Sequence, residues 1–118
     1  RVILGTFARM SGYRDQYCLK ALTVRTLIIK DFIKAFSKFD ILAAPAMPIL
    51  PPKFSEIEKL TPLQQYQMDA LTVPINLAGM PHISMPCGGS IPAGLHLMAD
   101  HMQESKLIEA AAAFEAMK

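Results

Sequence analysis

The sequence predicts an α/β fold, in which short apolar strands alternate with helices. Hydrophobic residues make up 52% of the 118 residues and charged residues only 19%, whereas globular domains usually carry about 25% charged residues. Residues 70–99 contain no Asp, Glu, Lys or Arg. So apolar a composition is unusual for a free-standing domain of this length. We therefore expect residues 1–118 to form a single segment, a C-terminal piece of a larger soluble protein.

Composition also excludes several classes of protein. Residues 70–99 hold too many prolines and glycines for a membrane-spanning helix. The hydrophobic content excludes disorder, and two cysteines are too few for a disulfide scaffold. We expect Cys18 and Cys87 to be buried thiols in a reducing cytoplasm. The net charge is +2, and the basic residues of the first 40 positions favour a solvated helix face over an RNA-binding surface, because no aromatic platform is interleaved with them.

Two helices are expected in the first 40 residues. A short helix should cover residues 2–10 and a long one residues 13–39, with a break at Ser11 and Gly12. The long helix would span about 40 Å, which suits packing along a larger body. Its apolar residues recur every three or four positions and form one stripe: Tyr17, Ala21, Val24, Ile28, Phe32, Ala35 and Phe39.

The remaining elements are shorter. The run at residues 41–44 predicts a buried strand, and the prolines within residues 45–52 favour a loop. Thr61 and Gln64 form a capping-box pattern, so a helix should cover residues 62–70. Further along, the patterns predict a turn over 74–78 closed by Gly79, strands over 82–85 and 95–98 joined by a hairpin loop, and a helix over 103–117 with Leu107, Ile108, Ala111, Phe114 and Met117 on its apolar face.

Few residues carry recognisable chemistry. His82, His96 and His101 match no zinc-ligand spacing, so we expect core or surface histidines and no metal site. The sequence has no phosphate-binding loop and no nucleophile elbow. Cys87 lies in a glycine-rich turn, but no nearby base or cation favours its thiolate.

Two charged residues stand out by their position. Asp69 is the last charge before the uncharged run, where a carboxylate needs a cation or several hydrogen bonds to offset its desolvation. Arg1 precedes the apolar residues Val2, Ile3 and Leu4. From residue chemistry alone, both can equally be surface residues.

Three sequence patterns are characteristic of one enzyme family. Residues 1–7 are RVILGTF, residues 24–28 are VRTLI, and residues 72–88 are TVPINLAGMPHISMPCG. Together they resemble the A subunits of glutamyl-tRNA(Gln) and aspartyl-tRNA(Asn) amidotransferases, within the amidase signature family. The resemblance covers essentially the whole chain. It implies a partial mixed sheet with flanking helices, the C-terminal part of an amidase signature fold.

The resemblance also implies an activity for the parent protein. That protein would be a cytoplasmic amidase that hydrolyses glutamine and passes ammonia to a B subunit. The B subunit would use ATP and Mg²⁺ to convert Glu-tRNA(Gln) to Gln-tRNA(Gln), or to amidate Asp-tRNA(Asn), and a C subunit would brace the complex. The family's Ser-Ser-Lys catalytic residues would lie upstream, so this segment would have no catalytic residue, no cofactor and no activity of its own.

By motif position, two substrate-binding residues of the family fall within this chain. Arg1 would bind the α-carboxylate of glutamine, and Asp69 would bind its α-ammonium. The sequence departs from the family pattern elsewhere. His82 replaces a smaller residue and His96 stands where a glutamine is usual, while Arg14 stands where a second aromatic residue is usual. These departures leave the exact substrate and the partner contacts open.

Two alternatives remain. One is a fragment of a general amide hydrolase of the same family with no role in tRNA chemistry, which the VRTLI pattern disfavours. The other is a helical interaction module with no enzymatic parent. A piece of a larger sheet should also expose apolar surface and unpaired strand edges, so we expect the isolated chain to self-associate.

Overall fold

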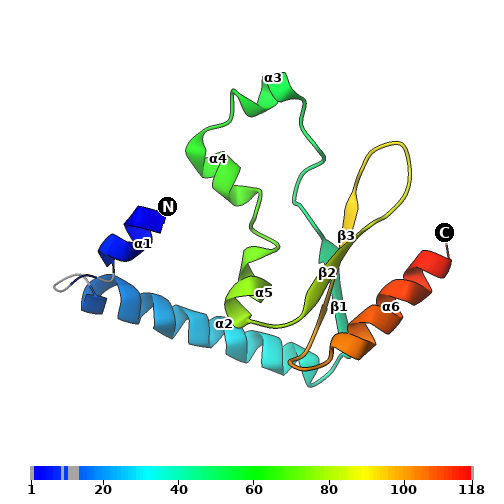
Figure 1. The fold of residues 1–118 in the computed structure, drawn as a ribbon, viewed down its shortest axis with the longest axis horizontal. Coiled ribbons are helices and arrows are strands. Elements are labelled where there is room, and N and C mark those ends of the chain that lie inside the picture. Colours follow the sequence, from blue (N-terminus) through cyan, green and yellow to red (C-terminus); the bar gives the residue numbers. More distant parts are fainter. Residues whose placement is uncertain (1, 9, 11–13, 118) are drawn as a thin grey trace.

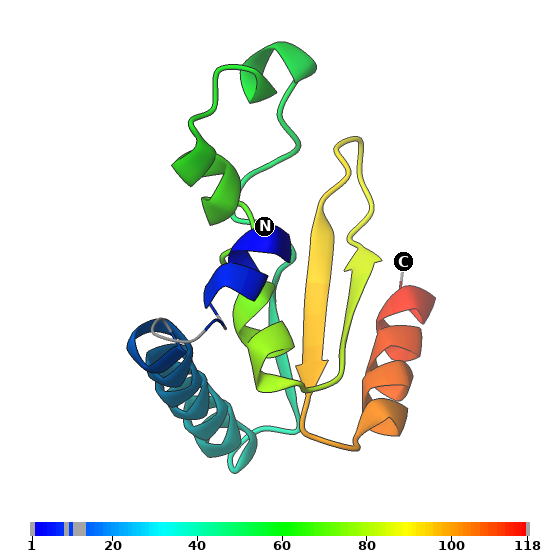
Figure 2. The ribbon, with the colours of Figure 1, turned by 60° about the vertical axis from the view of Figure 1, so that its left-hand side comes forward.

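A three-stranded sheet organises the chain, and helices lie on both of its faces (Figure 1). The computed structural model describes residues 2–8, 10 and 14–117. Helix α6 (Glu104–Ala116) covers one face of the sheet, and helices α2 (Lys20–Phe36) and α5 (Val73–Ala78) lie on the other (Figure 2). The structure thus confirms the predicted α/β class, with a partial sheet and flanking helices.

The sheet contains the three predicted strands, β1 (Ile41–Pro45), β2 (His82–Pro86) and β3 (Gly94–Ala99). Their order is β1-β3-β2, and both pairings are antiparallel. The mixed pairing implied by the family resemblance is therefore not found among the described strands. The reason is the connectivity: the loop between β2 and β3 makes an antiparallel hairpin, so β1 and β2 run in the same direction on either side of β3.

Alternating residues of β3 divide the core into two clusters. On one face, Leu97 and Ala99 pack with Met85 of β2 and with Leu107 and Ala111 of α6. On the other face, Met98 packs with residues of α2, β1 and α5 and of the turn after α5, namely Ile29, Phe32, Phe36, Leu42, Ala44, Ile75, Ala78 and Met80. Apart from Leu107 and Ala111, every buried hydrophobic residue of the described chain lies within the uncharged stretch 70–99. That stretch therefore supplies most of the buried core, as expected.

The N-terminal helices differ from the prediction. The first helix, α1 (Val2–Ala8), lies where it was predicted. The predicted long helix over 13–39 is divided: a π-helix, η1 (Arg14–Leu19), precedes α2, which ends at Phe36. Tyr13 lies outside the described residues. Tyr17 lies in the π turn and Phe39 beyond the end of α2, so only the middle of the predicted stripe lies on α2, where Val24 is 53% exposed.

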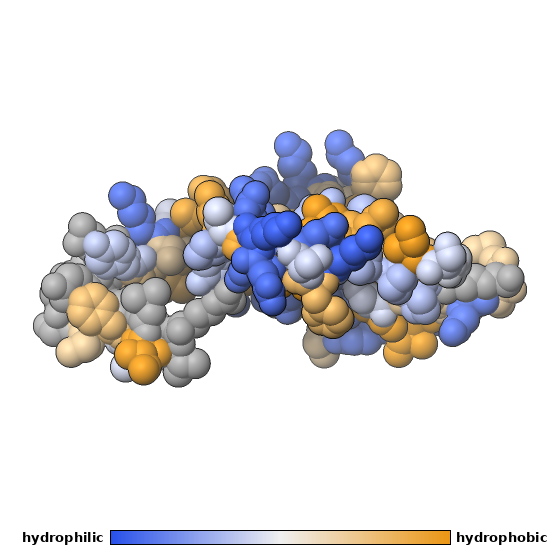
Figure 3. Space-filling view, turned by 90° about the horizontal axis from the view of Figure 1, so that it is seen from above, coloured by the Kyte–Doolittle hydropathy of each residue, from blue (hydrophilic) through white to orange (hydrophobic). Residues whose placement is uncertain are grey.

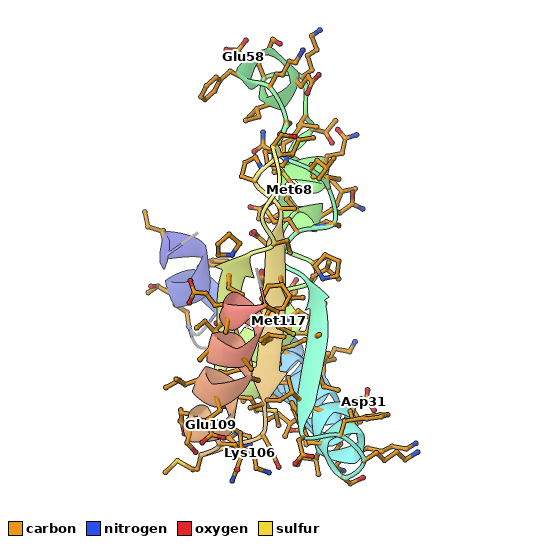
Figure 4. All side chains as sticks on the ribbon, turned by 90° about the vertical axis from the view of Figure 1, so that its right-hand side faces the viewer. Asp31, Glu58, Met68, Lys106, Glu109 and Met117 are labelled. Atoms are coloured by element: carbon orange, nitrogen blue, oxygen red, sulfur yellow. The ribbon has the colours of Figure 1, made fainter. Side chains whose placement is uncertain are left out.

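Between β1 and α5 the chain forms an arm that projects from the sheet (Figure 1), with Glu58 near its far end (Figure 4). It contains α3 (Phe54–Ile57), which was not predicted, and α4 (Pro62–Gln67), which was. The predicted capping box is present: the Gln64 N–H donates to the Thr61 hydroxyl, and Gln64 Oε1 accepts from the Thr61 N–H at 2.9 Å. Gly79 ends α5 at φ 73°, a left-handed conformation that favours glycine.

The surface is large and apolar for a chain of this size. The accessible area is 9015 Å², whereas a free-standing domain of 13.0 kDa exposes about 6300 Å². Apolar side chains are visible among the hydrophilic ones in Figure 3. The exposed apolar residues of the described chain include Phe54, Leu63 and Ile108, which are each more than half exposed. This confirms the expected exposure of apolar surface.

The two cysteines differ in their exposure to solvent. Cys18 is half-buried, but Cys87 is exposed, so the prediction that both thiols are buried is wrong for Cys87. The cause is local: Cys87 leads into the hairpin loop, where Gly88 and Gly89 turn the chain at positive φ away from the sheet.

None of the helices in the described part of the chain is long and apolar enough to cross a membrane.

Candidate functional site

Asp69 lies in the turn between α4 and α5, and its main chain is tightly held. Its carbonyl oxygen accepts hydrogen bonds from the Thr72 N–H at 3.1 Å, the Val73 N–H at 3.0 Å and the Thr72 hydroxyl at 3.3 Å. Its own N–H donates to the Tyr66 carbonyl oxygen at 3.2 Å. These bonds fix the backbone from which the carboxylate projects.

The Asp69 side chain itself is exposed, and no described residue forms a hydrogen bond or ion pair with its carboxylate. Of the two interpretations that the sequence left open, the described chain shows the surface one, and an exposed carboxylate needs no protein partner to offset desolvation. Arg1, the other predicted substrate-binding residue, lies outside the described residues. The substrate-binding role of both residues therefore stays a prediction.

Next to this turn, the structure contains a chain of polar side chains that the sequence did not predict. His96 Nε2 lies 3.0 Å from His82 Nδ1, and His82 Nε2 lies 3.2 Å from Asn76 Oδ1. The Asn76 amide nitrogen donates to the Thr72 carbonyl oxygen at 2.9 Å. Because Asn76 uses its amide N–H for Thr72, its Oδ1 is the acceptor for the His82 Nε2–H.

This arrangement sets the tautomers of both histidines. With its proton on Nε2, His82 presents an unprotonated Nδ1, which accepts from the Nε2–H of His96. The two rings meet edge to face at 86°, with centroids 5.0 Å apart. The hydrogen bonds therefore all run in one direction, from the centre of the sheet to the first turn of α5.

His96 is the buried end of this chain. It is 0% exposed on the central strand, and Nδ1 has no hydrogen-bond partner among the described residues. Burial, followed by the neighbouring His82 ring, lowers the pKa of His96 below its usual value of about 6.5. Above about pH 6.5, His96 is therefore mainly neutral, the form in which a single N–H can donate to His82.

Elsewhere, α2 and α5 border an open apolar groove of about 880 Å³. Its lining residues are Cys18, Ala21, Leu22, Val24, Arg25, Ile28 and Leu77. The Arg25 Nε donates to the Leu77 carbonyl oxygen at 2.6 Å and so joins the two helices. Within the described residues, no three His, Cys, Asp or Glu side chains are grouped so that they could hold a metal ion.

Comparison with known proteins identifies the family. The family model described as Amidase matches residues 1–108. The chain belongs to the amidase family.

Similar proteins are known in archaea and bacteria. The chain is 51% identical over 117 residues to the A subunit of glutamyl-tRNA(Gln) amidotransferase from Methanococcoides burtonii, and 49% identical over 117 residues to that from Moorella thermoacetica. In both cases the match covers 98% of this chain and 24% of the relative. A crystal structure of the A subunit of glutamyl-tRNA(Gln) amidotransferase from Thermotoga maritima matches 91% of this chain and 24% of that one, with a TM-score of 0.73 and 35% identity.

The chain thus spans about a quarter of the length of the amidotransferase subunits it matches. These likenesses confirm the resemblance drawn from the sequence motifs, and they confirm that the fold is part of an amidase fold. They leave the helical interaction module without support.

The histidine pair is the part of this amidase segment that sequence reasoning missed. The spacing of the three histidines matches no zinc-ligand pattern, and neither His82 nor His96 lies in a catalytic motif. The predicted hairpin offered a signal, because residues two apart on one strand share a face. The register places His96 opposite Ser84, so His82 is its diagonal neighbour on that face. Predicting the pair from sequence would have required the register of β2 against β3, which the length of the hairpin loop sets.

Proposed function

We propose that this chain is the C-terminal part of a larger amidase subunit that hydrolyses glutamine for tRNA-dependent amidation. The observation that carries the proposal is its likeness to amidotransferase A subunits, at about half identity across nearly the whole chain. The large exposed apolar surface supports the proposal that a larger amidase domain covers it. The VRTLI pattern of α2 supports the tRNA-dependent subunit over a general amide hydrolase.

In this proposal the segment binds substrate but does not attack it. Asp69 pairs with the α-ammonium of glutamine, and Arg1 pairs with the α-carboxylate. An exposed carboxylate on a fixed turn supports the role of Asp69, because its charge is free to meet an incoming cation while its backbone stays in place. The two charges together select a free amino acid over a bare amide.

The chemistry is then supplied from outside this segment. A Ser-Ser-Lys set in the rest of the amidase attacks the side-chain amide of glutamine and releases ammonia. A B subunit, with ATP and Mg²⁺, uses the ammonia on Glu-tRNA(Gln) or Asp-tRNA(Asn), and a C subunit braces the assembly in the cytoplasm. The segment alone is inactive in this proposal.

Glutaminase kinetics of the full-length amidase carrying Asp69→Asn test the role of Asp69. The amide keeps the size of the side chain and removes its charge, so the KM for glutamine should rise about tenfold or more, since hydrogen bonds to charged groups are worth about 1.5–3 kcal/mol. Asp31→Asn, on the exposed surface of α2, is the matched control and should leave KM unchanged. Equal KM values for the wild type and Asp69→Asn would remove Asp69 from the substrate site.

Amide hydrolysis without any dependence on tRNA or on partner subunits is the competing function. It predicts that simple amides without an α-ammonium are hydrolysed as well as glutamine, and that Asp69→Asn affects neither substrate. The same kinetic comparison, extended to a simple amide, therefore separates the two functions.

A further inference from the structure

A directed chain of hydrogen bonds links the centre of the sheet to the Asp69 turn. It begins at His96 Nε2–H, passes through His82 at 3.0 Å and Asn76 at 3.2 Å, and reaches the Thr72 carbonyl oxygen at 2.9 Å. Thr72 continues it, because both its N–H and its hydroxyl donate to the Asp69 carbonyl oxygen. Each link uses a donor on one residue and an acceptor on the next. Removing the donor at the His96 end should therefore loosen the backbone at the Asp69 end.

The buried end is a rigid anchor. His96 lies on the central strand, paired with Ala44 of β1 on one side and Ser84 of β2 on the other. Its ring is fully buried, and its hydrogen bond to His82 is the one that the described residues offer it. Losing this bond would leave both nitrogens of a buried ring unpaired, which is costly. The ring orientation of His96 is therefore fixed.

At the exposed end of the hydrogen-bond chain, the position of the Asp69 carboxylate has to be fixed. The Asp69 carboxylate has no described side-chain partner, so the backbone of residues 69–73 alone sets its location. That backbone continues into α5, a helix of only six residues, too short to be stable without tertiary contacts. Ile75 and Ala78 hold its buried side, and Asn76, through His82, holds its polar side.

We propose that His96, acting through His82 and Asn76, is a positioning residue for Asp69 and thereby sets the affinity of the amidase for glutamine. This rests on the proposed role of Asp69. A positioning residue touches neither substrate nor reacting atoms, so it changes where the carboxylate sits and leaves the bond-breaking step alone. Its removal should raise KM and spare kcat.

Kinetics of the full-length amidase that carries this segment provide the test. His96→Leu removes the N–H donor, and the KM for glutamine should rise about fivefold with kcat within about twofold, as expected when one net hydrogen bond is lost. His96→Gln keeps an N–H donor and should restore a KM close to wild type. Met98→Leu, on the same face of β3, is the packing control and should match wild type in both constants.

Two further variants make the test decisive. Asn76→Ala breaks the same chain at an exposed residue, so it should reproduce the KM of His96→Leu even where the latter folds poorly. In an Asp69→Asn background, His96→Leu should raise KM no further, because the group that it positions is already lost.

The outcomes separate this proposal from the one on which it rests. If Asp69→Asn leaves KM unchanged, the proposed role of Asp69 fails. If Asp69→Asn raises KM but His96→Leu and Asn76→Ala do not, the positioning role alone fails. It also fails if His96→Gln is as impaired as His96→Leu, or if the effects of His96→Leu and Asp69→Asn add in full.

Discussion

The isolated 118-residue chain should self-associate through its apolar surface, and α2 offers the clearest place to perturb it. Val24 and Leu27 are 53% and 55% exposed and lie three residues apart, on neighbouring positions of the helix surface. Replacing both with Glu puts two charges where a second copy would otherwise bury apolar side chains. The helix itself should tolerate the change, because Glu is a good helix former and neither residue is buried.

The size of the effect follows from the exposed area. The chain exposes 9015 Å², about 2700 Å² more than a free-standing domain of its mass exposes. One partner in a standard protein interface contributes only about 800 Å². Enough surface is thus available for association, and burying two half-exposed aliphatic side chains contributes about 1.5–3 kcal/mol. The double Glu variant should therefore raise the concentration at which half the chain associates by about tenfold or more.

Sedimentation velocity and light scattering across a concentration series measure this midpoint, and binding of a hydrophobic dye reports the exposed apolar surface. The matched control is Thr23→Glu with Thr26→Glu, which adds the same charge with the same spacing at exposed polar positions of the same helix. We expect this control to associate like wild type. A wild-type chain that stays monomeric and dye-negative at about 100 μM would refute the reasoning, since exposed apolar surface associates in the micromolar range and above.

Two predictions concern stability in the full-length protein. Because burial and His82 lower the pKa of His96, the unfolded chain binds more protons than the folded one at pH values below about 6.5. The stability contributed by neutral His96 is present above that pH and is lost as the pH falls towards the lowered folded-state pKa. The melting temperature should therefore drop less in His96→Gln than in the wild type when the pH is lowered from about 7.5 to about 5.5. Equal drops in the two proteins would contradict this prediction. Leu107→Ala opens a cavity between α6 and the sheet and should cost about 2–5 kcal/mol in urea unfolding. Glu109→Ala, at an exposed charged position of the same helix, is the control and should cost no more than about 0.5 kcal/mol.

Local chemistry determined which elements could be predicted from sequence. The start of α4 depends on Thr61, Pro62 and Gln64, which are close together in the chain, and the structure shows the predicted capping bonds. The end of α5 depends on Gly79, whose left-handed conformation needs no tertiary contact to explain it. Signals of this kind are complete within a few residues, so reading them requires no knowledge of the rest of the fold.

Features that depend on distant parts of the chain were predicted less well. The apolar period of residues 13–39 predicted one helix, because a π turn such as η1 has no distinct sequence signature. Cys87 belongs to an apolar stretch, so composition alone predicted a buried thiol, but the residue leads into a loop and is exposed. For the candidate site, the sequence indicated Asp69 by its motif position, but its exposure is a property of the fold, and its role stays a prediction.

The histidine pair shows why two departures from the family pattern belong together. His82 and His96 are fourteen residues apart in sequence. Without His82, the fully buried His96 ring would have no hydrogen-bond partner among the described residues, at a cost of about 1–3 kcal/mol. Together they satisfy one nitrogen of His96 and both nitrogens of His82, with Asn76 accepting the last proton. Because β3 is the central strand, this pair carries a polar connection from the core to the surface through a stretch that contains no charged residue. The uncharged stretch 70–99 therefore both builds the core and, through its two histidines, connects that core to the turn that carries Asp69.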